Sequence, residues 1–342
     1  RGAHVIALVT GAVPSTLVTL ADEVVEIRRI DLELVRTVIR AVTGQVAKHL
    51  DAADIVGLDL VNLVAAVRSG STAAACVRKL QMLRRNFVTS VDRPEVPVLA
   101  DLVGYGAAVE WAHAIDADVD RYRAGATVTF ETAVFHGPPG TGKTALVNSI
   151  AKTARIPLFT TSIAAWISRG EGNLGDALCA IDKYVETVAA AAPAVAFIDE
   201  IDALPDRARL SARNRDWWLP LINRALLAVE SLRRYDPPIV LVAATNRVTD
   251  LDPALVRAGR FDRLIEIPPP GVADLAAILD QLLGGEVPEA VLLQIASARR
   301  GATGADAQLW VTAAKRRASL EMRPVTAADL RREAIPPDDR RV

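Results

Sequence analysis

Two clusters of residues near the middle of the chain have the types and spacing that phosphate chemistry requires. The first is the segment GPPGTGKT at 137–144, and the second is the acid pair Asp199 and Glu200. Glycines let main-chain N–H groups turn toward phosphate oxygens, and a lysine followed by a hydroxyl suits a nucleotide and its Mg²⁺. Two acids at the end of a strand suit a metal and an attacking water. Together the clusters predict a site that binds and hydrolyses ATP with Mg²⁺.

The residue types also predict a role for each position. Lys143 is expected at the β and γ phosphates, and the Thr144 hydroxyl is expected to ligate Mg²⁺. Asp199 is expected to hold the same ion through its water shell, while Glu200 is the natural general base. The remaining predicted nucleotide contacts in this loop come from Pro138, Pro139, Gly140, Thr141, Gly142 and Ala145.

The elements that must position these residues alternate between strand and helix. The pattern predicts a strand over 128–136 before the glycine-rich segment and a helix after it, with further buried strands over 194–198 and 239–244. Helical spacing covers 174–191 and 217–232. This alternation predicts an α/β domain at 96–270 with a doubly wound parallel sheet of the P-loop NTPase type. A small all-helical lid domain is expected at 271–342.

Composition limits the class of protein. The chain has 342 residues, 51% of them hydrophobic, which is long enough and apolar enough for two or three folded units. A net charge of −1 offers no bulk field for nucleic acid or an anionic membrane. No apolar run is long enough for a membrane segment, and the two cysteines are typical of a reducing compartment, so a cytoplasmic location is expected. The four histidines are scattered and no HExxH occurs, which predicts no zinc protease site here.

Residues 1–95 contain a weak echo of the later part. The sequence at 24–39 aligns without gaps with 264–279, and VIALV at 5–9 is similar to the strand-like run at 239–243. One hypothesis is that residues 1–95 are the tail and lid of a degenerate ATPase module, in a chain that begins inside a longer protein. An unrelated α/β or helical adaptor is an equal alternative.

Beside the two nucleotide motifs, the segment AATNRVTDLDPALVRAGRFDR at 243–263 resembles the signature of the AAA+ ATPases that carry the second region of homology. The resemblance covers about 100–333 and points to the branch of protein unfoldases and AAA proteases. It implies that Asn246 orients the lytic water, and that Arg257 and Arg260 are arginine fingers that reach a neighbouring subunit's nucleotide. A homo-oligomeric ring, usually a hexamer, is therefore expected.

The resemblance also implies contacts to the adenine. Val103 and Gly104 occupy the place of a segment whose main chain contacts the base, and Gly304 and Ala305 occupy the place of the second sensor. No arginine stands at that sensor, which favours the unfoldase-like branch over clamp loaders and replication initiators.

A third implied feature is a pore loop that grips polypeptide, with Trp166 and Ile167 as its aromatic and aliphatic residues. Core or interface packing is the alternative for this tryptophan. Trp217 and Trp218 depart from the family pattern and are expected to pack half-buried in an interface; a second pore loop or a partner surface is the alternative. The basic run at 207–215 is expected to be a solvated flexible loop, with phosphate or nucleic acid binding as the lesser alternative.

Three functions follow in order of preference. The first is an ATP-driven ring that unfolds, threads or remodels protein clients. The second is an ATP-dependent assembly switch or adaptor that threads nothing. The third is a DNA-dependent machine, which the near-neutral charge and the missing sensor arginine disfavour.

Overall fold

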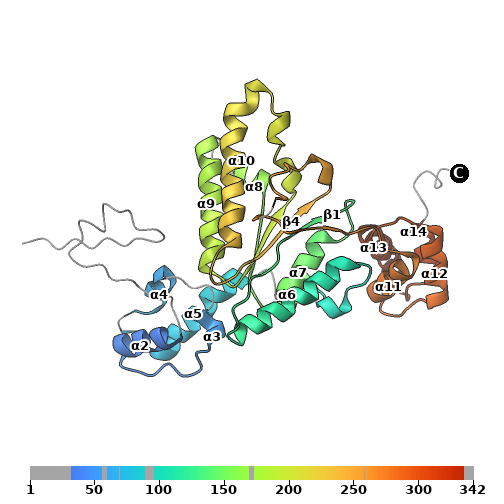
Figure 1. Ribbon diagram of the computed structural model, residues 1–342. Helices are drawn as coiled ribbons and strands as arrows, with labels where there is room; N and C mark the ends of the chain where they lie inside the picture. Colours follow the sequence, from blue (N-terminus) through green and yellow to red (C-terminus); the bar gives the residue numbers. More distant parts are fainter. Residues whose placement is uncertain are drawn as a thin grey trace, which may run out of the picture.

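Three groups of elements make up the part of the chain that the computed structural model describes, namely residues 32–55, 60–68, 70–88, 96–168, 173–257 and 259–334. Figure 1 shows a helical module near the start of the chain, a central α/β domain and a second helical domain near its end. Separate clusters of buried apolar side chains lie in the two helical parts, and two more lie in the α/β domain.

The central domain is built on a five-stranded sheet in the order β2-β3-β4-β1-β5. Every pair of neighbouring strands is parallel. The strands are β1 (Ala133–His136), β2 (Leu158–Ser162), β3 (Val195–Asp199), β4 (Val240–Thr245) and β5 (Arg263–Glu266). The predicted doubly wound parallel sheet is therefore confirmed, and β4 lies between the two strands that lead into the predicted site.

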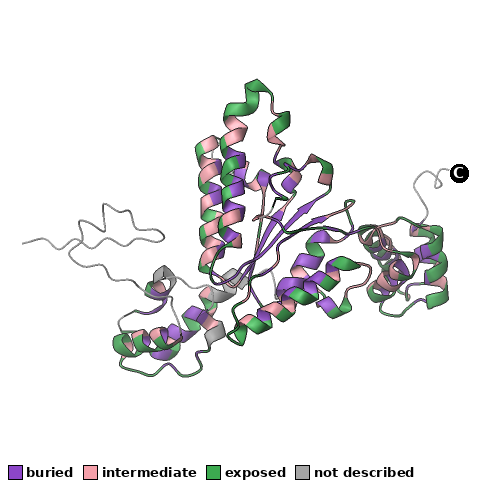
Figure 2. Cartoon of the chain, viewed as in Figure 1, coloured by how far each residue is buried: buried purple, intermediate pink, exposed green. Residues whose placement is uncertain are grey.

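Helices cover both faces of this sheet, and alternate strand residues point to each face. Ala196 and Ile198 belong to a cluster with α8 (Ile163–Ile167), α9 (Leu174–Ala190) and α10 (Ala212–Arg233), whereas Phe197 belongs to the cluster on the other face. That opposite face is covered by α6 (Ala107–Arg123) and α7 (Lys143–Ala154). Figure 2 shows the resulting buried sheet between two helical layers.

Two predicted elements differ in extent from the observed ones. The strand predicted over 128–136 begins only at Ala133, because Thr132 makes side-chain contacts instead: its hydroxyl donates to the Arg260 carbonyl at 2.7 Å and its amide donates to the Asp262 carboxylate at 3.1 Å. The helix predicted over 217–232 begins at Ala212 and continues through Pro220. Its early turns are held where Trp217 and Trp218 pack against the core.

The predicted helical lid is confirmed by four helices after the sheet. They are α11 (Val272–Leu283), α12 (Glu289–Ala298), α13 (Gly304–Leu320) and α14 (Ala327–Glu333). Gly284 and Gly285 lie between α11 and α12, and Gly301 lies between α12 and α13, as expected for turns; the four helices share a core of their own. The lid is thus a separate packing unit joined to the sheet domain by the segment after β5.

The first module is also helical. It contains α2 (Leu32–Thr43), α3 (Ala52–Ile55), α4 (Leu60–Ala66) and α5 (Ala73–Val88), which pack around Ile39, Leu50 and Leu80. The strand predicted at 5–9 lies outside the described residues. Among the helices that the structure describes, none has both the length and the apolarity needed to cross a bilayer.

Candidate active site

The glycine-rich segment lies between the end of β1 and the start of α7 and turns sharply at its glycines. Gly137 has φ 151°, and a Cβ there would lie 2.2 Å from the Ile267 carbonyl oxygen. Gly142 has φ 90° and precedes the first residue of α7. The loop therefore presents main-chain N–H groups beside the positive end of a helix, which is a site suited to phosphate.

Lys143 is held in place before any phosphate arrives. Its ammonium nitrogen donates to the carbonyl oxygens of Gly137 and Pro138, both at 2.8 Å, and the residue is buried. Burial lowers the pKa of Lys143, while Asp199 and Asp202 act in the opposite direction. The Lys143 ammonium group is therefore already held against the glycine-rich loop.

Thr144 and Asp199 bring a hydroxyl and a carboxylate together from two different elements. The Thr144 hydroxyl at the start of α7 donates to Asp199 Oδ2 at the end of β3, at 3.4 Å. Hard oxygen ligands of this kind, with room for water, suit Mg²⁺, which usually takes one or two protein oxygens and keeps several waters. The residues therefore fit the ion that the sequence predicts.

Glu200 follows directly and has a fixed main chain. Its φ of 49° is left-handed, and its amide donates to Asp199 Oδ1 at 2.9 Å. The side chain is exposed at the same edge of the sheet, where a water molecule has access to it. Asn246 is exposed just after β4, and because β4 lies between β3 and β1, it stands between the acid pair and the glycine-rich loop.

Two further segments close over the loop, and both contain predicted base contacts. The Ala305 amide at the start of α13 donates to the Gly140 carbonyl at 3.2 Å, which brings Gly304 and Ala305 to the glycine-rich loop. A Cβ on Gly104 would lie 3.1 Å from the Asp274 Cβ on α11. Val103 is half-buried beside it. The lid therefore contacts both the 103–104 segment and the glycine-rich loop.

Tyr105 is a site residue that the sequence prediction missed. The Tyr105 hydroxyl donates to the Gly142 carbonyl at 3.3 Å. A Cβ on Gly142 would lie 2.2 Å from the Tyr105 hydroxyl oxygen. Burial raises the pKa of the phenol, so the hydroxyl remains a donor at neutral pH. The only signal in the sequence was its position next to Gly104, because the contact to the loop joins residues far apart in the chain.

The two predicted arginine fingers have different surroundings. Arg260 is occupied within its own chain: its guanidinium pairs with Glu230 at 2.7 Å and donates to the Ala254 carbonyl at 2.7 Å. Arg257 is exposed, and no ion pair joins its side chain to another described residue. In this chain Arg260 fastens the loop to α10, whereas the Arg257 side chain is exposed; the role of both as arginine fingers stays a prediction.

The basic run at 207–215 is not a simple solvated loop either. Arg207 forms a two-point contact with Asp252, with its Nε 2.6 Å from Oδ2 and its Nη2 3.1 Å from Oδ1. Asp252 is 1% exposed and also accepts from the Ala254 amide at 2.8 Å. This pair ties the segment after β3 to the turn that leads to Arg257 and Arg260.

The pore-loop prediction for Trp166 is wrong in this conformation. Trp166 is 2% exposed, packs in the core and lies 6.3 Å from the Tyr184 ring, because α8 turns this side chain toward α9. Ile167 is half-buried against the same cluster. Trp217 and Trp218 are half-buried as predicted, with their rings 4.8 Å apart.

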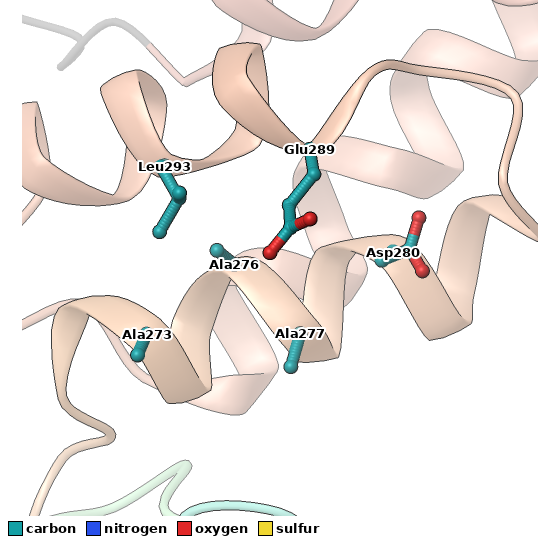
Figure 3. A pocket seen from close by; sticks show the side chains of 6 residues that line it. All are labelled: Ala273, Ala276, Ala277, Asp280, Glu289 and Leu293. Carbon is teal, nitrogen blue, oxygen red and sulfur yellow. The ribbon is translucent and has the colours of Figure 1, made fainter.

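Two grooves lie away from these residues, one in the lid and one beside α2. A groove of about 320 Å³ lies between α11 and α12 in the lid, lined by Ala273, Ala276, Ala277, Asp280, Glu289 and Leu293 (Figure 3). The predicted phosphate site is instead an open edge of main-chain amides. Within the described residues, no group of three or more His, Cys, Asp and Glu side chains is arranged to hold a metal ion.

Comparison with known proteins agrees with this geometry. Residues 133–269 match the family described as "ATPase family associated with various cellular activities (AAA)". The chain is 34% identical over 241 residues to the ATP-dependent zinc metalloprotease FtsH 3 of Sphaerobacter thermophilus, which covers 67% of this chain and 47% of that protein. It is 33% identical over 258 residues to FtsH of Acidothermus cellulolyticus, a match that covers 72% of this chain and 38% of that protein. It is 35% identical over 191 residues to the YME1 homolog of Caenorhabditis elegans, covering 54% and 25%. The chain thus spans less than half the length of these relatives.

Proposed function

Because residues 133–269 belong to the AAA family of ATPases, whose chemistry is the hydrolysis of ATP with Mg²⁺, we propose that this chain uses that reaction to remodel proteins as part of an oligomeric ring. The observation that carries the proposal is the contact between the Thr144 hydroxyl and the Asp199 carboxylate beside the buried Lys143. It joins the phosphate loop to the acid pair, which is the minimum that nucleotide hydrolysis requires.

In this proposal each side chain at the sheet edge has one task. Lys143 holds the β and γ phosphates, and Thr144 and Asp199 hold Mg²⁺, which supplies charge neutralisation at the phosphoryl group. Glu200 accepts the proton of the attacking water, and Asn246 orients that water from the neighbouring strand. Because the Asp199 carboxylate accepts from the Glu200 amide, the metal ligand and the base keep a fixed spacing.

Tyr105 and the lid complete the pocket. We expect the main chain of Val103 and Gly104 to contact the base on one side, and Gly304 and Ala305 to contact it on the other. The proposed domain boundaries follow from this arrangement: an ATPase domain at 96–270 and a lid at 271–342, each with its own buried core.

The ring follows from Arg257. A guanidinium stabilises the charge that spreads over the transferred phosphoryl group, and this one is exposed, whereas Arg260 is bound to Glu230. A head-to-tail arrangement that closes on itself places such a residue at the next subunit's site. We expect Arg257 to act on the neighbouring subunit.

A complementation experiment tests both roles together. Glu200→Gln and Arg257→Ala should each abolish turnover while nucleotide binding persists. When the two variants are mixed during assembly, about a quarter of the interfaces should pair an intact Glu200 with an intact Arg257, and turnover should return. Glu186→Gln, an exposed acid on α9, serves as the control and should keep full activity. Unimpaired hydrolysis by the Glu200 variant, or no recovery on mixing, would contradict the proposal.

We propose that the energy of ATP hydrolysis is used to remodel polypeptides. The relatives are named as ATP-dependent proteases, and the shared part of this chain is the ATPase domain. We expect a chemically unfolded protein to raise the ATPase rate several-fold.

An assembly switch that threads nothing is the second candidate, and the burial of Trp166 favours it. The same assay separates the two. Stimulation by unfolded polypeptide supports remodelling, whereas an ATP-dependent ring whose rate ignores polypeptide supports the switch.

A further inference from the structure

The helical module at 32–88 repeats the plan of the lid. Its first helix, α2, and the first lid helix, α11, each contain 12 residues. The buried side chains Val35 and Ile39 of α2 occupy the same positions along the helix as Leu275 and Leu279 of α11. This agrees with the gap-free alignment of 24–39 with 264–279.

Both first helices end in the same way. Gly44 follows α2 with φ 68°, and Gly284 follows α11 with φ 70°. The Gly44 amide donates to the Arg40 carbonyl at 2.9 Å, and the Gly284 amide donates to the Asp280 carbonyl at 2.8 Å. Both helices therefore end in a residue with left-handed backbone conformation, which residues other than glycine rarely adopt.

The helices α5 and α13 also begin alike. The Thr72 hydroxyl accepts from the Ala75 amide at 3.2 Å, and the Thr303 hydroxyl accepts from the Asp306 amide at 3.3 Å. A glycine with φ 83° or 85° precedes each threonine by two positions. The two units differ between these matched ends, where α3 and α4 stand in place of α12.

A groove occurs on the same face of both first helices. The one beside α2 has a volume of about 450 Å³ and is lined by Leu32, Glu33, Arg36, Thr37, Arg40 and Val46. Glu33, Arg36, Thr37 and Arg40 occupy the positions of Ala273, Ala276, Ala277 and Asp280 in the lid groove of Figure 3. The two units therefore share the position of the groove, although Ala276 is buried in the lid and Arg36 at the matched position is exposed.

The two units differ in what covers them. In the lid, Gln281 donates to the Asp101 carbonyl at 2.9 Å, and the Ala305 amide donates to Gly140. The equivalent positions in the first module are Ala41 and Ala74, and both are exposed. Gln281 and Ala305 are just as exposed, so the difference is that, among the described residues, neither Ala41 nor Ala74 makes a hydrogen bond to an element outside 32–88.

We infer that residues 32–88 are a second lid, and that the face containing Ala41 and Ala74 docks on a second P-loop domain that precedes Leu32 in the same protein. The occupant is fixed by chain order, since in the lid the residues immediately before α11 lead directly out of the sheet domain that it covers. The domain at 133–269 is not the occupant, because it already binds its own lid through Gly140.

Site-specific photocrosslinking in the full-length protein tests this. Ala41→benzoylphenylalanine is the probe, and Gln281→benzoylphenylalanine is its matched control, since both positions are exposed and equivalent. The control should crosslink to residues near Asp101. The probe should crosslink within the same chain to a peptide that precedes Leu32.

Three results would overturn the inference: an adduct of the Ala41 probe with 133–269, an adduct with a different chain in mixed isotope-labelled samples, or no adduct while the control reacts. A third variant, Val64→benzoylphenylalanine, reports on non-specific reaction, because Val64 is 65% exposed on α4. ATPase measurements are not part of the readout, so failure here is distinct from failure of the proposed hydrolysis.

Discussion

Replacing Arg207 by alanine should destabilise the α/β domain, because its partner Asp252 is buried. The guanidinium makes two contacts with the carboxylate, at 2.6 and 3.1 Å, and Asp252 is 1% exposed. The same carboxylate starts the turn that leads to Arg257, since it accepts from the Ala254 amide. The variant leaves a buried charge with only main-chain donors.

The size of the loss follows from the exposure of each partner. A fully buried pair that loses one member costs about 3–5 kcal/mol, and an exposed pair costs at most about 1 kcal/mol. The Arg207 side chain is 35% exposed, which puts the expected loss between these limits, at about 2–4 kcal/mol. Arg207→Lys should lose less stability than Arg207→Ala, because the lysine keeps a positive charge beside Asp252. It should not restore the wild-type stability, because an ammonium cannot make the two-point contact.

The pH dependence has a definite sign. The pKa of Asp252 lies below its ordinary value: burial opposes the charged form, but the contacts from Arg207 and Ala254 outweigh it. A depressed folded-state pKa gives stability that is present above the unfolded pKa and lost as pH falls through the folded value. The difference in the free energy of unfolding between wild type and Arg207→Ala should therefore be largest near neutral pH and should decrease as the pH falls.

Urea unfolding followed by tryptophan fluorescence measures this difference, because Trp166, Trp217 and Trp218 all pack in the cluster on that face of the sheet. Arg213→Ala is the control, since Arg213 is exposed in the first turn of α10, and it should change stability by less than about 0.5 kcal/mol. A loss for Arg207→Ala no larger than that of the control would refute the reasoning.

Four further variants probe the site and the ion pair beside it. Tyr105→Phe removes the hydrogen bond to Gly142, so KM for ATP should rise about fivefold with little change in kcat, as steady-state kinetics would show; a fall in kcat alone would argue against it. Arg257→Ala should lower kcat on the order of 10³-fold and leave the urea midpoint unchanged. Arg260→Ala should instead lower the free energy of unfolding by about 1–3 kcal/mol, and Glu230→Ala should lower it by a similar amount; a free energy of unfolding that stays at the wild-type value in both variants would show that the pair does not hold this loop in place.

The main features of the fold were predictable because they depend on local patterns. Buried parallel strands are continuous apolar runs, and the segments ending at Ile198 and Ala244 were found from that property alone. Turn glycines such as Gly284 marked the helix ends in the lid. The carboxyl ends of parallel strands share one edge, which is why the acid pair and the glycine-rich loop could be expected to meet.

Side-chain partners were not predictable, because they join residues far apart in the sequence. Nothing in the pattern around Arg260 indicates that Glu230, on another element, occupies its guanidinium. The burial of Trp166 likewise depends on where α9 packs, since the neighbouring Ile167 has the same apolar character and is only half-buried. Tyr105 was missed for the same reason.

The hydrogen bond from the Ala305 amide to the Gly140 carbonyl couples the position of the lid to the phosphate loop. A side chain at position 140 would meet the Thr303 hydroxyl at 2.8 Å and the Ala305 Cβ at 3.0 Å, and the backbone there has φ 80°. A side chain at position 140 would therefore push Thr303 and Ala305 of the lid away from the loop. Chimeras that exchange lids between homologous chains should fail at this seam unless the loop is transplanted with them.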